Sequence, residues 1–205
     1  MLSPFEIVAI GFTAFITVDM AKYLRSGELK KDFSSLRTLR GWKWIGAIPV
    51  TLVLLFITLS FGLFLMQIGR PIMDWSWLKL LQTPGERVEG QNLMTSGLRI
   101  PWFALPFLIL LGLNVPRLAK REERAFRQGT RTLPEALGRS VHFGLIHCIV
   151  GVPIGIGLAL TIPGLWFTYV YLKGGIRLST AWHVVYNYII LSMAAVWLVS
   201  PLFLP

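Results

Sequence analysis

The sequence predicts an all-α, polytopic membrane protein with six to seven transmembrane or partly spanning helices, in a single domain over residues 1–205. Hydrophobic residues make up 54% of the 205-residue chain and charged residues only 15%, with a mean hydropathy of +0.63. This composition lies outside the range of soluble globular proteins. The apolar residues are gathered in long runs, and the basic residues cluster at the ends of those runs.

The net charge of +10 and the single cysteine restrict the classes of partner and site. A basic protein can bind nucleic acid, but bases at the ends of apolar runs are typical of membrane orientation signals. We therefore expect a lipid bilayer around the chain and no nucleic acid. Cys148 lies in an apolar run, where it is expected to serve packing, and one cysteine forms neither an intrachain disulfide nor a cysteine-based zinc site.

The first half of the chain contains two expected spans and one polar connection. Residues 2–18 are mostly apolar and just long enough to cross a bilayer of about 30 Å. Residues 44–68 form a long run without charge and are the clearest span. Residues 70–99 are polar, and Trp75 and Trp77 favour a stretch along the membrane surface.

The second half contains apolar runs that prolines and glycines divide. Residues 100–115 hold prolines, so we expect either a kinked span or a short one that ends where the charged helix begins. Residues 141–172 are too long for one straight span, and we expect two segments divided between 150 and 164. A small basic turn follows, and residues 179–204 form the last expected span.

Two strongly basic connections predict the orientation of the chain. Residues 20–43 and 117–139 are rich in lysine and arginine, which favours the cytoplasmic side for both, with residues 70–99 on the opposite side. We expect a multi-pass protein of a bacterial inner membrane or of a thylakoid or other organellar membrane.

Two adjacent glutamates, Glu122 and Glu123, lie in the second basic connection. On a helix Glu123 shares a face with Arg127 in the favourable order, so we expect these two to pair. Glu122 is rotated by about 100° and has no base three or four positions later, so its carboxylate is expected to be available. Taken alone, this segment is more typical of acids that merely neutralise a basic helix.

Two polar pairs lie in the apolar segments that follow. Phe143 and His147 are four residues apart, as are His183 and Asn187, so each pair occupies one helical face. A lone histidine at membrane depth can be an interhelical hydrogen bond and nothing more. Here two of the chain's three histidines lie at that depth, and we expect the third, His142, at the interface.

Taken in order, these motifs resemble the CPBP family of intramembrane proteases, which includes the type II CAAX prenyl endopeptidases and proteins of bacteriocin processing and immunity. The resemblance covers residues 117–190, with two departures: Gln128, where a glycine commonly follows the arginine, and the density of arginines around the glutamates. It implies that residues 100–205 form a protease-like core and residues 1–99 supply N-terminal helices and loops. The implied catalytic residues are Glu122, His147, His183 and Asn187, with Glu123, Arg127 and Phe143 supporting them.

The resemblance implies glutamate-dependent hydrolysis of a peptide bond in a membrane-embedded or lipid-anchored substrate, without a cofactor. Glu122 would activate water with His147, and His183 and Asn187 would donate hydrogen bonds to the oxyanion. In an alternative, Glu122, His147 and His183 hold zinc. A non-catalytic assembly, immunity or scaffold protein in a membrane complex is the rival function, and a small transporter with a Glu and His proton relay ranks third.

Overall fold

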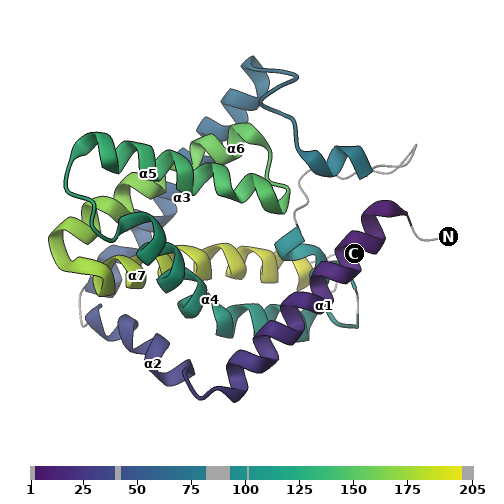
Figure 1. The fold of residues 1–205 in the computed structure, drawn as a ribbon, viewed down its shortest axis with the longest axis horizontal. Coiled ribbons are helices and arrows are strands. Elements are labelled where there is room, and N and C mark those ends of the chain that lie inside the picture. The colour runs from purple at the N-terminus through teal and green to yellow at the C-terminus, as the bar shows by residue number, and fades with distance from the viewer. Residues whose placement is uncertain (1–2, 40–42, 82–92, 101, 200–205) are drawn as a thin grey trace.

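The protein is described by a computed structural model for residues 3–39, 43–81, 93–100 and 102–199 (Figure 1). Within these ranges the ordered elements are all helices and no strand occurs, so the all-α part of the predicted fold class is confirmed. The α-helices are α1 Pro4–Arg25, α2 Leu29–Phe33, α3 Lys43–Ile68, α4 Ala104–Arg127, α5 Leu133–Ile146, α6 Ile154–Ala159 and α7 Thr161–Val199. Short 3₁₀ helices connect them: η1 Ser34–Thr38, η2 Trp77–Leu81, η3 Leu93–Arg99 and η4 His147–Val150.

Three helical stretches are long and apolar enough to cross a membrane, judged by length and composition: Pro4–Arg25, Lys43–Ile68 and Ile154–Val196. Large apolar side chains cover their outer surfaces, among them Phe15 on α1 and Phe56 on α3, which are 65% and 72% exposed. Apolar surface of this extent is rare on soluble monomers and marks contact with a membrane or a partner. The first two stretches contain most of the spans expected at 2–18 and 44–68, and residues 1–2 lie outside the described part.

Helix α4 differs from the expected boundary, because the apolar residues and the charged segment form one continuous helix through Pro116. The reason is packing: the inner side of α4 stays buried on both sides of the proline, at Phe107, Val115 and Ala119. Proline removes one backbone hydrogen bond, which this continuous burial outweighs. The two glutamates therefore lie in the last turns of a long helix, where Arg127 suits the negative end of the helix dipole.

The two basic connections are also more helical than expected. Residues 20–43 contain the end of α1, all of α2 and η1, and the start of α3. Residues 117–139 contain the end of α4 and the start of α5. Thr132 caps α5 and exchanges hydrogen bonds with Glu135, whose carboxylate also accepts the N–H of Arg131. These backbone N–H groups hold the pKa of the Glu135 carboxyl below its usual value.

The expected division of residues 141–172 is confirmed. Helix α5 ends at Ile146, η4 and α6 follow, and Gly151 has a φ of 94°, in the left-handed region that favours glycine. Helix α7 then begins at Thr161, close to the expected boundary. Residues 200–204, the end of the last expected span, lie outside the described part.

Helix α7 consists of two arms that fold back on each other at Gly175, which has φ 71° and ψ −173°. Phe167 and His183 stack with ring centroids 4.6 Å apart, although 16 residues of straight helix would separate them by about 24 Å. Trp166 and Trp182 also meet across the two arms, at 5.3 Å. Figure 1 shows the chain reversing direction between the green and the yellow part of α7, beside α4 and α5. The turn expected near Lys173 and Arg177 is thus a sharp reversal.

Candidate functional site

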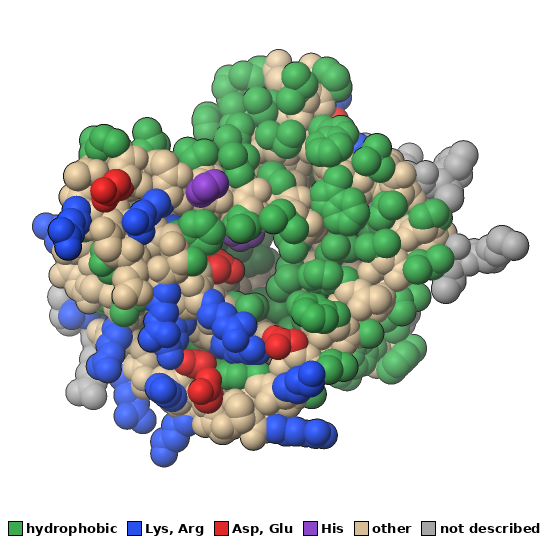
Figure 2. Space-filling view, in the orientation of Figure 1, with side chains coloured by type: hydrophobic (Ala, Val, Ile, Leu, Met, Phe, Trp, Pro, Cys, Tyr) green, Lys and Arg blue, Asp and Glu red, His purple; other side chains and the backbone are tan. Residues whose placement is uncertain are grey.

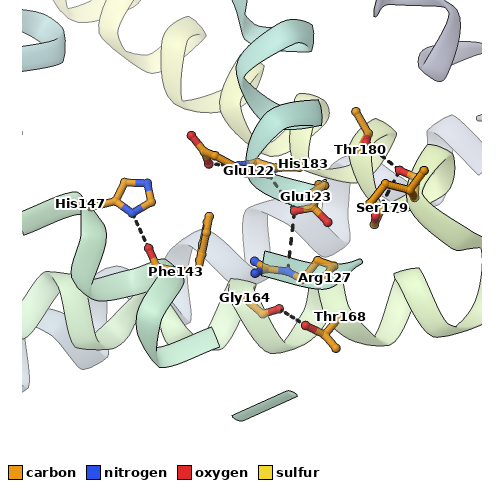
Figure 3. Close-up of polar contacts among 11 residues, drawn as sticks. Glu122, Glu123, Arg127, Phe143, His147, Gly164, Thr168, Ser179, Thr180 and His183 are labelled. Atoms are coloured by element: carbon orange, nitrogen blue, oxygen red, sulfur yellow. Dashed lines mark hydrogen bonds and ion pairs between the residues drawn. The ribbon is translucent and has the colours of Figure 1, made fainter. Parts of the chain in front are cut away.

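The site is centred on His183, which lies on the second arm of α7 between two carboxylates of α4 (Figure 3). His183 Nδ1 donates a hydrogen bond to Glu123 Oε1 at 3.0 Å. On the other side of the ring, Nε2 is 3.5 Å from Glu122 Oε2. Adjacent residues on a helix point about 100° apart, so the two glutamates can contact the two edges of one imidazole.

Arg127 completes the buried part of the site. Its Nε is 3.8 Å from Glu123 Oε1, so the pair expected from the spacing is present, and both side chains are fully buried. The guanidinium also lies over the Phe143 ring, 4.4 Å from Cζ to the centroid. No hydrogen-bond partner is recorded for its nitrogens within the described residues, so Glu123 and the aromatic face are its main compensation.

Two phenylalanines hold the imidazole of His183 in place. Phe167, from the first arm of α7, stacks on it with an interplanar angle of 17° and a centroid distance of 4.6 Å. Phe143 of α5 meets it edge to face at 5.5 Å. His183, Phe143 and Phe167 are all at least 97% buried, so the ring is fixed by packing as well as by its hydrogen bond.

His147 begins η4, directly after α5 ends. Its Nδ1 is 2.7 Å from the carbonyl oxygen of Phe143, and because a carbonyl only accepts, Nδ1 must carry a proton. The neutral ring therefore has its lone pair on Nε2. His147 is half-buried and its ring lies 5.0 Å from that of Phe143, the residue that also touches His183. Phe143 thus links the two histidines, while His142 is exposed.

Glu122 and Asn187 have side-chain polar atoms without a hydrogen-bond partner among the described residues. The Glu122 side chain is 32% exposed, and its Oε2 has no hydrogen-bond partner in the described structure. A separation of 3.5 Å from His183 is longer than a good hydrogen bond, so Glu122 is near a histidine but not tied to it. Asn187 is half-buried one turn beyond His183, and none of the hydrogen bonds found among the described residues involves it.

Figure 2 shows how this region meets the surface. The face is hollowed near its centre, and histidine and acidic side chains are visible beside the hollow. Lysine and arginine side chains gather on one side of it and apolar side chains on the other. Partial exposure of Glu122 and burial of Glu123 mean that Glu122 is the carboxylate that an incoming molecule can reach.

The set proposed for zinc, Glu122, His147 and His183, is not assembled as a ligand cluster. In the described ranges, no group of three or more His, Cys, Asp or Glu side chains is arranged to hold a metal ion. Glu122 and His183 are close to each other, but the nearest recorded polar contact of His147 is a backbone carbonyl.

Phe167 is the residue of the site that the sequence analysis missed. It lies in a long apolar run, and nothing in its spacing distinguishes it from other core aromatics. The arrangement as a whole offers a reachable carboxylate beside a buried, oriented imidazole, which suits general acid–base chemistry.

A scan against protein-family models, a search of curated proteins and a search of solved structures each found no match for this chain.

Proposed function

We propose that the protein is a glutamate-dependent intramembrane endopeptidase, similar to the CPBP proteases, that hydrolyses a peptide bond of a membrane-embedded or lipid-anchored substrate. The observation that carries the proposal is the contact of both glutamates of α4 with His183 of α7, in which Glu122 is partly exposed and Glu123 is buried. A buried acid beside a buried imidazole is expensive to maintain, and such clusters are often found at functional sites.

In this proposal each side chain has one role. Glu122 acts as the general base that takes a proton from water, and His147 Nε2, which bears the lone pair, accepts a hydrogen bond from that water and so orients it. The proton taken by Glu122 is then passed to His147 Nε2, which gives it to the leaving amine. Asn187 donates a hydrogen bond to the developing oxyanion, and His183 donates one from Nε2 when its ring is doubly protonated, because Nδ1 already donates to Glu123. Glu123 accepts the Nδ1 proton of His183 and so fixes the orientation of the ring.

The membrane setting is part of the proposal. Helices beyond the three long apolar stretches, including α4, would complete a bundle of six to seven spanning or partly spanning helices. Residues 20–43 and 117–139 would face the cytoplasm in a bacterial inner membrane or its organellar equivalent.

The test replaces Glu122 by Gln in the native host and compares the termini of membrane peptides with those of the wild type. Loss of the base is expected to lower cleavage about 10²- to 10⁴-fold, so uncleaved precursors should accumulate. Glu28→Gln is the matched control, because Glu28 is an exposed acid outside the site. An unchanged peptide profile in Glu122→Gln cells, with protein levels intact, would contradict the peptidase proposal.

A non-catalytic membrane assembly, immunity or scaffold protein is the second candidate. It is favoured by the complete burial of Glu123 and Arg127, which is what a cluster that only joins helices would require. In that case Glu122→Gln would leave peptide termini unchanged, and Arg127→Ala, which removes the buried pair with Glu123, would release the protein from its complex.

The chemistry is proposed without a metal, with zinc at Glu122, His147 and His183 as the alternative. Metal analysis of the purified protein separates the two. Zinc bound in a one-to-one ratio, and lost together with activity on chelation, would replace the proposal with the zinc version.

A further inference from the structure

Two ion pairs join the N-terminal helices to α4 just before the site. The carboxylate of Asp19, on α1, accepts two hydrogen bonds from the Arg117 guanidinium, at 2.8 and 3.3 Å. One turn further along α4, Lys120 Nζ is 2.6 Å from Asp32 Oδ1, at the end of α2. Neither pair has a role in the proposed chemistry, yet both bridge separate helices.

Tyr23 connects the two pairs into one network. Its hydroxyl donates to Asp32 Oδ2 at 3.0 Å, and its ring lies under the Arg117 guanidinium, 4.7 Å from Cζ to the centroid. Tyr23 and Asp32 are each 4% exposed. A buried carboxylate that is satisfied by two donors is costly to disturb, so this network gives α4 a definite position against α1 and α2.

The side chains of the network and of the site follow one another along the same side of α4. Arg117, Lys120 and Glu123 follow one another at intervals of three, so their side chains lie along one side of the helix. The first two contact α1 and α2, and the third contacts His183 of α7. Any rotation of α4 that moved Glu123 away from His183 would also break both ion pairs.

We propose that Asp19–Arg117 and Asp32–Lys120 are positioning pairs, which fix the rotation of α4 about its axis and so keep Glu122 and Glu123 on either side of His183. Their importance for catalysis rests on the proposed function. Their effect on the contact between the two carboxylates and His183 is independent of that function. It can be measured without a substrate.

The test is ¹⁵N NMR of the full-length protein labelled at histidine, in which the three histidines are assigned by single replacements. The double variant Asp32→Asn/Lys120→Met removes the ion pair without leaving a buried charge unpaired. The ring resonances of His183 are expected to shift, and those of exposed His142 to stay in place.

The matched control is Asp74→Asn/Lys79→Met, which removes an ion pair of 2.8 Å outside α4 and should leave His183 unshifted. Unchanged His183 resonances in a folded Asp32→Asn/Lys120→Met protein would overturn the inference, as would an equal shift in the control.

If the double variant does not fold, Tyr23→Phe removes only the hydroxyl donor to Asp32 and is expected to give a smaller shift of His183. No shift there would overturn the inference as well. A shift in a protein without peptidase activity would support the positioning role and count against the proposed function alone.

Discussion

At the scale of single residues, the site depends on how Glu123 is compensated. Its Oε1 contacts both His183 and Arg127, and its other oxygen has no partner among the described residues. A fully buried carboxylate is stable only when opposite charge and donors surround it. We therefore predict that replacing either Glu123 or Arg127 alone lowers the stability of the protein.

Arg127→Met tests that dependence. We expect it to destabilise the protein by about 3–5 kcal/mol, because it leaves Glu123 buried with His183 as its only partner. Glu123→Gln/Arg127→Met should recover part of that loss, since no buried charge is then stranded. The measurement is unfolding of the purified protein in detergent, with Arg124→Met, an exposed arginine of the same helix, as the control expected to stay within about 0.5 kcal/mol. If Arg127→Met were as stable as Arg124→Met, the role given to Arg127 would be contradicted.

The spacing of residues predicted the Glu123–Arg127 pair but could not place either glutamate against His183. Four residues on one helix are local geometry, which a sequence expresses directly. Glu123 and His183 are 60 residues apart, and their contact depends on how α4 rests on the folded α7. The same reason explains why spacing alone did not pair Glu122 with His183 or Lys120 with Asp32.

At the scale of the elements, the reversal of α7 at Gly175 brings the site together. The first arm supplies Phe167 and the second supplies His183, and the two rings stack only because the arms run side by side. The sequence indicated a turn here through its basic residues, but not the tightness of the reversal. That tightness comes from a backbone conformation which, at φ 71° and ψ −173°, is essentially restricted to glycine.

Gly175→Ala is expected to destabilise the protein by about 1–3 kcal/mol through backbone strain. Space is not the cause, because no atom lies within 4 Å of the added Cβ. Gly138→Ala is the matched control: it also meets open space but lies in the helix α5, where alanine should be neutral or stabilising by up to about 1 kcal/mol. Thermal unfolding of both variants in detergent compares them, and a Gly175→Ala protein as stable as Gly138→Ala would show that the turn is not strained.

At the scale of the whole molecule, composition alone predicted the all-helical fold and the apolar surface. Long apolar runs favour helices and apolar outer surfaces with little dependence on tertiary packing. For this reason the structure agrees with the sequence prediction on both points. The extent of α4 was harder to predict, because continuous burial beyond Pro116 overrides the local tendency of proline to end a helix.

Orientation is tested by labelling single cysteines in membrane vesicles with an impermeant maleimide. In a background with Cys148→Ala, we expect Lys31→Cys and Arg131→Cys to react from the cytoplasmic side, because both lie in the basic segments. Ile72→Cys, at an exposed position after α3, should react from the opposite side. Labelling of Lys31→Cys and Arg131→Cys from different sides would contradict the proposed topology.

The carboxylates around His183 are proposed to belong to a site that hydrolyses peptide bonds. The most direct measurement incubates the purified protein, in liposomes with membrane peptides from cells that lack it, in H₂¹⁸O. Hydrolysis inserts one water oxygen into each new C-terminus, so mass spectrometry should find ¹⁸O-labelled termini with the wild type and with Glu28→Gln, and at least about 10²-fold fewer with Glu122→Gln. Labelled termini produced equally by the wild type and Glu122→Gln, or by neither, would contradict the claim.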